Sequence, residues 1–202
     1  MLMIMITVAV SILLRGVLMF SFGKEPYVYP SFTEGEPVNV YGAIIQQQTL
    51  WVIGITGFCI VSLFFFFKKT IVGKAMLACA VNPTAAQLVG INVSRMVMFS
   101  FVLSGIVGAI GGMAITPISL MEYDKGPMLA VKGFCAAIMG GLGSNRGAVI
   151  GGFLIGILES MTAGYIHSGM KDGIALIILL LILFFKPAGL FVSKTMLELR
   201  KF

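Results

Sequence analysis

The sequence contains little charge. Only 11% of its 202 residues are Asp, Glu, Lys or Arg, whereas a soluble domain carries about 25%. So few charged side chains cannot cover a surface that faces water on all sides, which excludes a soluble globular fold. Hydrophobic residues make up 58% of the chain and the mean hydropathy is +1.04, values that indicate an integral membrane protein.

The chain is also poor in metal ligands and in nucleophile motifs. Its three cysteines are far apart, no C-x-x-C motif occurs, and His167 is the only histidine. A structural zinc site, a redox dithiol and a haem held by two histidines therefore lack ligands. The serine motif G-x-S-x-G is absent as well. We therefore expect no catalytic residue, no metal and no cofactor.

Six apolar segments approach the roughly 20 residues that a helix needs to cross a bilayer. They cover residues 3–22, 49–67, 96–118, 129–142, 148–166 and 173–185. The fourth and sixth are short, although the sixth reaches Val192 if it continues through Pro187. The predicted fold is an all-α bundle of about six transmembrane helices, with residues 1–202 in one domain.

The net charge of +6 comes from basic residues at the ends of these segments. Short clusters without a basic groove or interleaved aromatic side chains exclude a nucleic-acid surface. The positive-inside rule puts the segment between the second and third spans in the cytoplasm, together with the C-terminus. The basic residues concerned are Lys68, Lys69, Lys74, Arg95, Arg146, Lys186, Lys194, Arg200 and Lys201. The acidic stretch 23–48 then lies outside, as an interfacial segment.

Residues 73–95 form the predicted cytoplasmic loop, and a short helix lies within it. An N-cap residue and a proline mark its start, and a glycine marks its end. These residues are Asn82, Pro83 and Gly90, with Ala85 and Ala86 between them. Such a helix either lies on the membrane or its own bundle, or docks on a soluble partner.

Glycines recur at helical spacing in two of the predicted spans. Small residues let helix backbones approach closely, so these faces predict helix–helix contact. They are Gly105, Gly108 and Gly112 in the third span and Gly147, Gly151, Gly152 and Gly156 in the fifth. Glu159 lies one turn beyond the last two glycines, so we expect it to point into the bundle.

Charged residues and irregular backbone at membrane depth are costly, and they are usually paired or functional. Glu159 is either an interhelical or interfacial group, or a gating group of a transport pathway. Lys132 either reaches the outer headgroups or partners an acidic residue beside that pathway. Gly140, Gly141 and Gly143 form either a turn between two helices or a broken helix that lines the pathway.

Three stretches resemble one protein family. Residues 73–112, GKAMLACAVNPTAAQLVGINVSRMVMFSFVLSGIVGAIGG, are similar to the coupling loop and next helix of ABC-importer permeases. More narrowly, they resemble the high-affinity branched-chain amino-acid permeases. Residues 132–160, KGFCAAIMGGLGSNRGAVIGGFLIGILES, resemble the second signature of that family, and residues 184–191, FFKPAGLF, its closing segment.

The resemblance implies the membrane permease subunit of an ATP-driven importer in the cell membrane. Its partners would be ATP-binding subunits, a sibling permease and an extracytoplasmic substrate-binding protein. The ATP-binding subunits would dock around Ala85, Ala86 and Gly90. More distant importers have Glu-Ala-Ala there, and Thr84 replaces that glutamate in this chain. No G-x-x-x-x-G-K-[ST] phosphate loop occurs, so ATP hydrolysis belongs to another chain.

The resemblance leaves the substrate and the function class open. Branched-chain amino acids are the default substrate, with urea, amides and other small solutes as alternatives. A non-transporting assembly subunit would also use a capped cytoplasmic helix and glycine-rich spans. An intramembrane enzyme is disfavoured by the missing catalytic motifs. Because family members have further hydrophobic segments before the region matching residues 3–22, we expect the chain to be N-terminally incomplete relative to the family.

Overall fold

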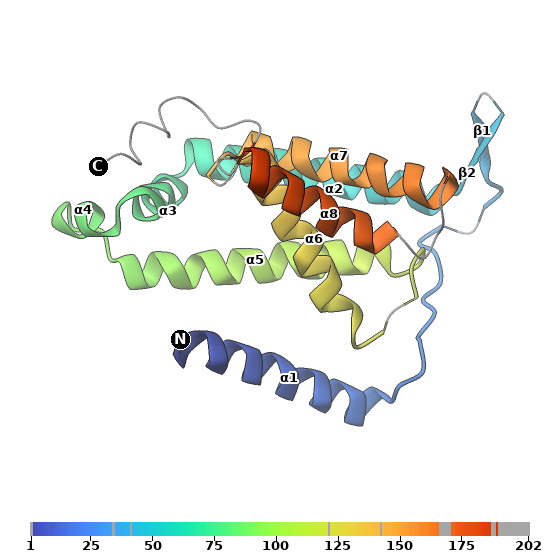
Figure 1. The fold of residues 1–202 in the computed structure, drawn as a ribbon, viewed down its shortest axis with the longest axis horizontal. Coiled ribbons are helices and arrows are strands. Elements are labelled where there is room, and N and C mark those ends of the chain that lie inside the picture. Colours follow the sequence, from blue (N-terminus) through green and yellow to red (C-terminus); the bar gives the residue numbers. More distant parts are fainter. Residues whose placement is uncertain are drawn as a thin grey trace. The chain divides into compact units, whose positions relative to one another are not determined.

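The computed structural model describes residues 2–33, 35–40, 42–120, 122–141, 143–165, 171–186 and 189. Most of these residues are helical, which confirms the all-α prediction (Figure 1). Several predicted features lie outside the described residues. They are His167, the extension of the last span to Val192, most of the stretch after Lys186, and the basic residues Lys194, Arg200 and Lys201.

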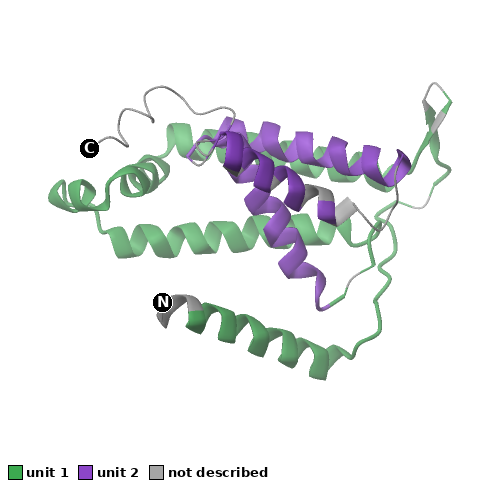
Figure 2. Ribbon diagram, viewed as in Figure 1, with its two compact units in different colours: residues 1–122 green, residues 123–202 purple. Residues whose placement is uncertain are grey.

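The chain divides into two compact units, residues 1–122 and 123–202, and each is described by itself (Figure 2). Unit 1 contains α1 (Leu2–Phe22), β1 (Val38–Val40), β2 (Ala43–Ile45), α2 (Gln47–Lys69), α3 (Ile71–Val81), α4 (Pro83–Leu88) and α5 (Val93–Ile115). Unit 2 contains α6 (Lys125–Gly140), α7 (Asn145–Tyr165) and α8 (Lys171–Phe185). The single domain expected from the sequence stays a prediction.

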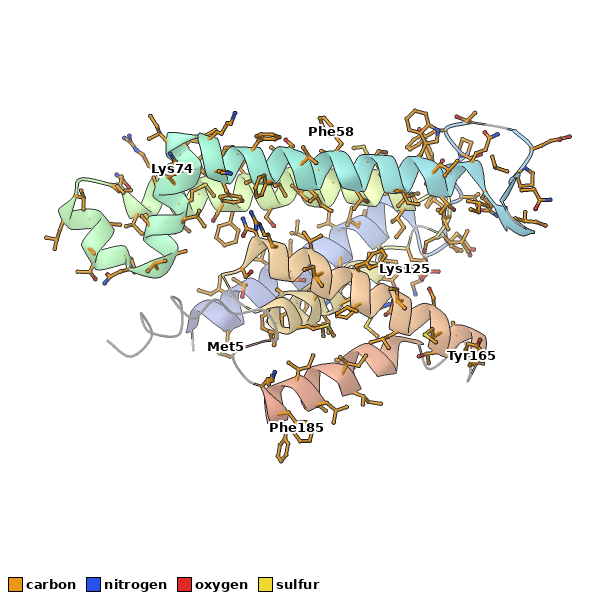
Figure 3. The ribbon with its side chains drawn as sticks, turned by 90° about the horizontal axis from the view of Figure 1, so that it is seen from above. Met5, Phe58, Lys74, Lys125, Tyr165 and Phe185 are labelled. Carbon is orange, nitrogen blue, oxygen red and sulfur yellow. The ribbon has the colours of Figure 1, made fainter. Side chains whose placement is uncertain are left out.

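Among the described residues, α1, α2, α5 and α7 are long and apolar enough to cross a membrane. Helices of 21 to 23 residues are about 32–35 Å long, close to the hydrocarbon thickness of about 30 Å. Helices α6 and α8, with 16 and 15 residues, are shorter, as the sequence predicted. Large apolar side chains such as Phe58 project outward from α2 (Figure 3), as expected where lipid is the solvent.

Gln48, near the start of α2, fastens the parts of unit 1 together. Its side chain is only 4% exposed. Its Nε2 donates to the Ala114 carbonyl at 3.0 Å, and its Oε1 accepts from the Phe32 amide at 3.1 Å. Ala114 lies in the last turn of α5, where carbonyls have no partner within the helix. Gln48 thus supplies a donor to a helix end and sets α5 antiparallel to α2.

The segment before α2 contains a small hairpin that the sequence analysis did not foresee. Strands β1 and β2 are antiparallel, Val38 pairs with Ile45, and Gly42 lies in the turn at φ +89°. Three-residue strands are too short to show the alternation that predicts a strand. Trp51 then anchors the preceding segment, because its Nε1 donates to Thr33 Oγ1 at 3.0 Å.

Helix α3 was also missed: residues 73–95 were expected to form a loop, whereas the apolar run that begins in α2 continues as helix beyond Lys69. Thr70 breaks the run: it ends α2 and caps α3, where its Oγ1 accepts from the Gly73 amide at 3.0 Å. Gly73 is buried against the backbone of α2, and an added Cβ would meet the carbonyl oxygen of Phe66 and lie 2.8 Å from Phe67 Cα. This glycine lets α3 turn back onto α2.

Unit 2 is built on a close hairpin of α6 and α7. A Cβ on Gly140 would collide with the backbone of Gly147, and one on Gly151 with the Ala136 carbonyl oxygen. Glycine at these positions therefore allows backbone-to-backbone contact. Cys135 and Met139 of α6 and Ile155 of α7 form the buried core, and Ile178 and Ile182 of α8 pack against it.

The other predicted glycine faces have a different environment. A Cβ at Gly152 would lie 3.8 Å from Ala136 Cβ, which is ordinary contact. A Cβ at Gly105, Gly108, Gly112 or Gly156 would have no neighbour within 4 Å in the described part of the chain. The packing role of these four glycines stays a prediction.

We expect Gly151→Ala to destabilise unit 2, because its methyl group would overlap the Ala136 carbonyl oxygen. Overpacking of this kind costs about 1–3 kcal/mol. Gly156→Ala, on the same helix with open space around it, is the matched control: it shares the gain in helix propensity, up to about 1 kcal/mol, without the overlap, so it should not lower stability. Thermal unfolding of both variants in detergent measures the difference. Equal unfolding midpoints would contradict the close contact.

Candidate functional site

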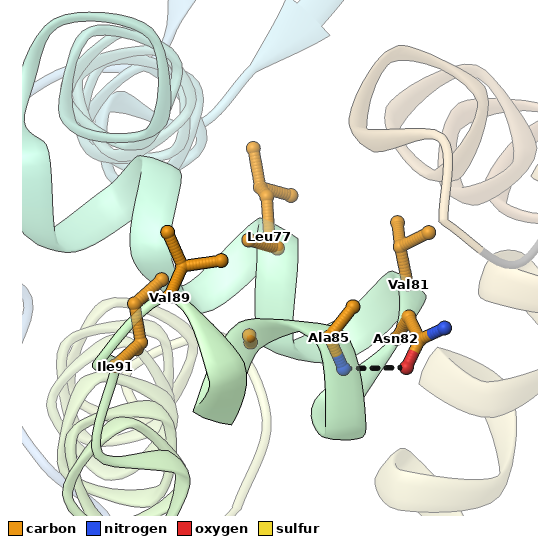
Figure 4. Close-up of a pocket in the computed structure, with 8 residues that line it drawn as sticks. Leu77, Val81, Asn82, Ala85, Val89 and Ile91 are labelled. Carbon is orange, nitrogen blue, oxygen red and sulfur yellow. Dashed lines mark hydrogen bonds between the residues drawn. The ribbon is translucent and has the colours of Figure 1, made fainter.

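Helix α4 in unit 1 forms as the sequence predicted. Asn82 Oδ1 accepts from the Ala85 amide at 3.0 Å, and Pro83 is the first helical residue (Figure 4). Asn82 is therefore the N-cap of α4. Proline suits the next position, because a backbone amide there would have no partner within the helix. Gly90 follows the helix at φ +86°.

The C-terminus of α4 is closed by a Schellman motif. The Gly90 amide donates to the Gln87 carbonyl at 2.9 Å, and the Ile91 amide donates to the Ala86 carbonyl at 3.0 Å. The left-handed conformation at Gly90 allows both bonds, and any side chain there would be strained. A six-residue helix is thus held rigid by caps at both ends.

An open groove of about 590 Å³ runs between α3 and α4 (Figure 4). Its lining is almost wholly apolar and consists of Leu77, Ala78, Val81, Asn82, Ala85, Ala86, Val89 and Ile91. Ala86 is buried, whereas Val89 is 81% exposed. The sequence had indicated the α4 residues and missed Leu77, Ala78, Val81 and Ile91. Leu77, Ala78 and Val81 lie exposed on α3, a segment that had been expected to belong mostly to a loop.

In unit 2, Lys132 of α6 and Glu159 of α7 form an ion pair. The Lys132 Nζ lies 2.7 Å from Glu159 Oε1, and each side chain is 20% exposed. Glu159 Oε1 itself is buried and, in the described part of the chain, has no hydrogen-bond partner of good geometry, so the Lys132 charge is what compensates it. Lys132 thus has the acidic partner that one of its two predicted roles requires. A role in a pathway stays a prediction for both residues.

The glycines between α6 and α7 form the tight turn of the hairpin. Gly141 and Gly143 have φ angles of +92° and +95°, and Gly141 caps α6. Ser144 then starts α7, because its Oγ accepts from the Gly147 amide at 3.1 Å. The turn that the sequence offered as one alternative is therefore present, and whether it also lines a pathway stays a prediction.

Neither region is arranged for metal chemistry. Across the residues that the structure describes, no group of three or more His, Cys, Asp or Glu side chains could hold a metal ion. The chemistry on offer is an apolar groove, a rigid exposed helix and a partly buried ion pair.

Comparison with known proteins places the chain among transport proteins. It is 30% identical over 190 residues to the high-affinity branched-chain amino acid transport system permease protein LivH of Escherichia coli K12. It is 27% identical over 188 residues to the corresponding protein BraD of Pseudomonas aeruginosa. Each match covers 91% of this chain and 61% of the relative, so the chain spans less than two thirds of their length.

A sugar permease is also similar, over a smaller region. The chain is 32% identical over 103 residues to the ribose import permease protein RbsC of Haemophilus influenzae, which is 48% of this chain and 32% of that protein. No solved structure matches the chain. The family described as the branched-chain amino acid transport system permease component matches residues 1–183. Family membership and four apolar helices establish a membrane protein, and the chain belongs to this family of permease components.

Proposed function

We propose that this chain is a transmembrane permease subunit of an ATP-driven importer, and not an enzyme. The observation that carries the proposal is α4, a rigid exposed helix beside an open apolar groove at one end of unit 1. A machine that couples ATP hydrolysis to transport needs such a rigid contact, because a flexible loop would absorb the motion that it must transmit. Membership of the permease family supports this assignment.

The groove between α3 and α4 is the proposed docking site for an ATP-binding subunit. It would take an apolar side chain of that subunit, since its lining offers almost no hydrogen-bonding group. Leu88 adds exposed apolar surface beside it, and Val89, which lines it, is exposed as well. An exposed apolar patch on a cytoplasmic segment is typical of a protein interface. The basic residues near this end support its cytoplasmic placement.

The remaining partners and the substrate follow from the relatives. LivH and BraD belong to branched-chain amino acid transport systems, which supports these amino acids as the substrate. The match to a ribose permease covers about half of the chain, so it supports the importer class rather than a sugar substrate. An importer of this class also uses a sibling permease and an external substrate-binding protein, which we include in the proposal.

The Lys132–Glu159 pair is the proposed pathway element. A transported amino acid carries one ammonium and one carboxylate group, so it can interact with both charges of the pair. The two side chains are partly exposed rather than sealed in the core. Ionisable groups inside membrane bundles commonly mark such pathways. Gly140, Gly141 and Gly143 hold the hairpin that positions the pair.

We expect Ala85→Leu to reduce docking, because Ala85 lines the groove and the larger side chain would fill it. Recovery of the ATP-binding subunit with the purified permease should fall about tenfold, equivalent to about 1.4 kcal/mol. Transport per ATP hydrolysed should fall with it.

Gln87→Leu is the matched control for this prediction. It adds the same side chain to the same helix at an exposed position that does not line the groove. Membrane insertion should be normal in both variants. If both recover the ATP-binding subunit equally well, the groove is not the docking site.

The ion pair is tested by exchanging its charges. Glu159→Gln or Lys132→Gln alone leaves an uncompensated group and should lower stability by roughly 2–3 kcal/mol. The double variant Lys132→Glu with Glu159→Lys restores the pair and should recover most of that stability. Uptake should stay low, since each charge then meets the wrong end of the substrate.

Thermal unfolding and uptake in vesicles distinguish the two roles in the exchanged variant. Recovery of both stability and uptake would leave the pair a purely structural role. Recovery of stability alone supports contact with the substrate.

A further inference from the structure

Unit 1 gathers its basic residues at one end of its helices. Lys68 and Lys69 end α2, Lys74 lies in the first turn of α3, and Arg95 lies in the first turn of α5. The four residues are called the basic end below. All four side chains are exposed, and Lys74 lies where α3 leaves α2 (Figure 3).

These residues come together because of contacts already described. Gly73, next to Lys74, packs on Phe66 and Phe67 just before the two lysines of α2. The hydrogen bond from Gln48 to Ala114 joins the start of α2 to the end of α5. The end of α2 and the start of α5 must then lie at the opposite end, and α3 contacts both helices there.

The basic end has no counter-charge within unit 1. The sequence contains no Asp or Glu from residue 37 to residue 121. The carboxylates of unit 1 are Glu25, Glu34, Glu36 and Glu122, which precede α2 or follow α5. The length of α2, about 35 Å, separates Glu36 and Glu122 from the basic end, so salt at physiological strength screens their attraction.

Helix dipoles do not balance this charge either. The C-terminus of α2 contributes roughly half a negative charge. The N-termini of α3 and α5 lie at the same end of the unit, and each contributes roughly half a positive charge. The four positive charges of the basic end therefore have no balancing negative charge nearby within unit 1.

The positions of the ammonium groups indicate what kind of anion is bound. Lys68 Nζ lies 5.5 Å from the centre of the Phe64 ring, and Lys69 Nζ lies 5.4 Å from that of Phe65. Each lysine thus folds back one turn along α2, beside rings of the membrane-spanning segment. If these lysines bound a soluble protein, we would expect their side chains to extend away from the membrane into water. Charges at the edge of the hydrocarbon are at the level of lipid phosphates.

We propose that the basic end binds the phosphodiester headgroups of anionic phospholipids in the adjoining leaflet. Lysine binds phosphate as a point charge, and the arginine adds a planar fork of donors. Each basic residue near an anionic membrane surface strengthens binding by about 1 kcal/mol, or about fivefold. The site depends only on residence in the membrane and is independent of the proposed importer function.

The test uses the full chain in detergent with an equal mixture of phosphatidylglycerol and phosphatidylcholine that share the same acyl chains. Native mass spectrometry counts the lipids retained. The unchanged chain should retain phosphatidylglycerol at least tenfold in preference. Replacement of Lys68, Lys69 and Lys74 by Gln should abolish this preference, and Lys74→Gln alone should reduce it about fivefold.

Two controls separate a specific site from general charge. Replacement of the same three lysines by Arg keeps the charge and should keep the preference. Lys24→Gln removes one exposed positive charge remote from the basic end and should have no effect. Should Lys24→Gln reduce the preference as much as Lys74→Gln does, the basic end is not the binding site.

A second measurement identifies the source of the phosphate. Soluble glycerol phosphate at the same concentration should not displace the retained lipid. Displacement would instead indicate a site for a free anion and overturn the proposal. Equal retention of both lipids by the unchanged chain would likewise overturn it, and would point to an acidic protein surface as the partner of the basic end.

Discussion

Peptide groups in hydrocarbon have no water to bond with, so the backbone of this chain must satisfy itself wherever a helix stops. Four helices of the described chain begin with the same device. The side chains of Thr70, Asn82, Asn92 and Ser144 each accept a hydrogen bond from the amide three residues ahead. At the other end of α5, Gln48 gives the Ala114 carbonyl its donor. These breaks are each matched by a polar side chain, whereas α2 and α6 begin without a side-chain cap. The capped breaks position both candidate sites.

Hydropathy and capping rules anticipate much of this architecture. The long spans follow from apolar length alone, and α4 follows from Asn82, Pro83 and Gly90 within a polar neighbourhood. Helix α3 does not follow, because its 11 residues are too few for a membrane span and its cap, Thr70, comes directly after the two lysines that mark the end of α2. The β1–β2 hairpin is too short to carry a pattern. Local signals therefore suffice for α4, where a proline and a glycine mark the two ends, and fail for α3 and for the β1–β2 hairpin.

Each candidate site likewise has a part that the sequence predicts and a part that it does not. The α4 residues were indicated by their sequence neighbours, whereas the groove needed α3 to supply Leu77 and Val81. Glu159 was expected to follow the Gly152/Gly156 face. The closest backbone contacts are instead those of Gly147 and Gly151 with α6. The pairing of Glu159 with Lys132 is a long-range contact between α7 and α6. It depends on how closely the backbones of these two helices approach, which a single sequence does not reveal.

Charge in unit 1 is arranged along the helices rather than across them. With no carboxylate from residue 37 to residue 121, the α2–α5 pair is neutral in the middle and positive at one end. The opposite end is fastened by neutral contacts, Gln48 with Ala114 and Trp51 with Thr33. Because unit 1 has no carboxylate near these basic residues in its described part, their charge acts on what surrounds the unit. The asymmetry favours one orientation in the membrane, and it presents α4 and its groove on the side where the positive charge collects.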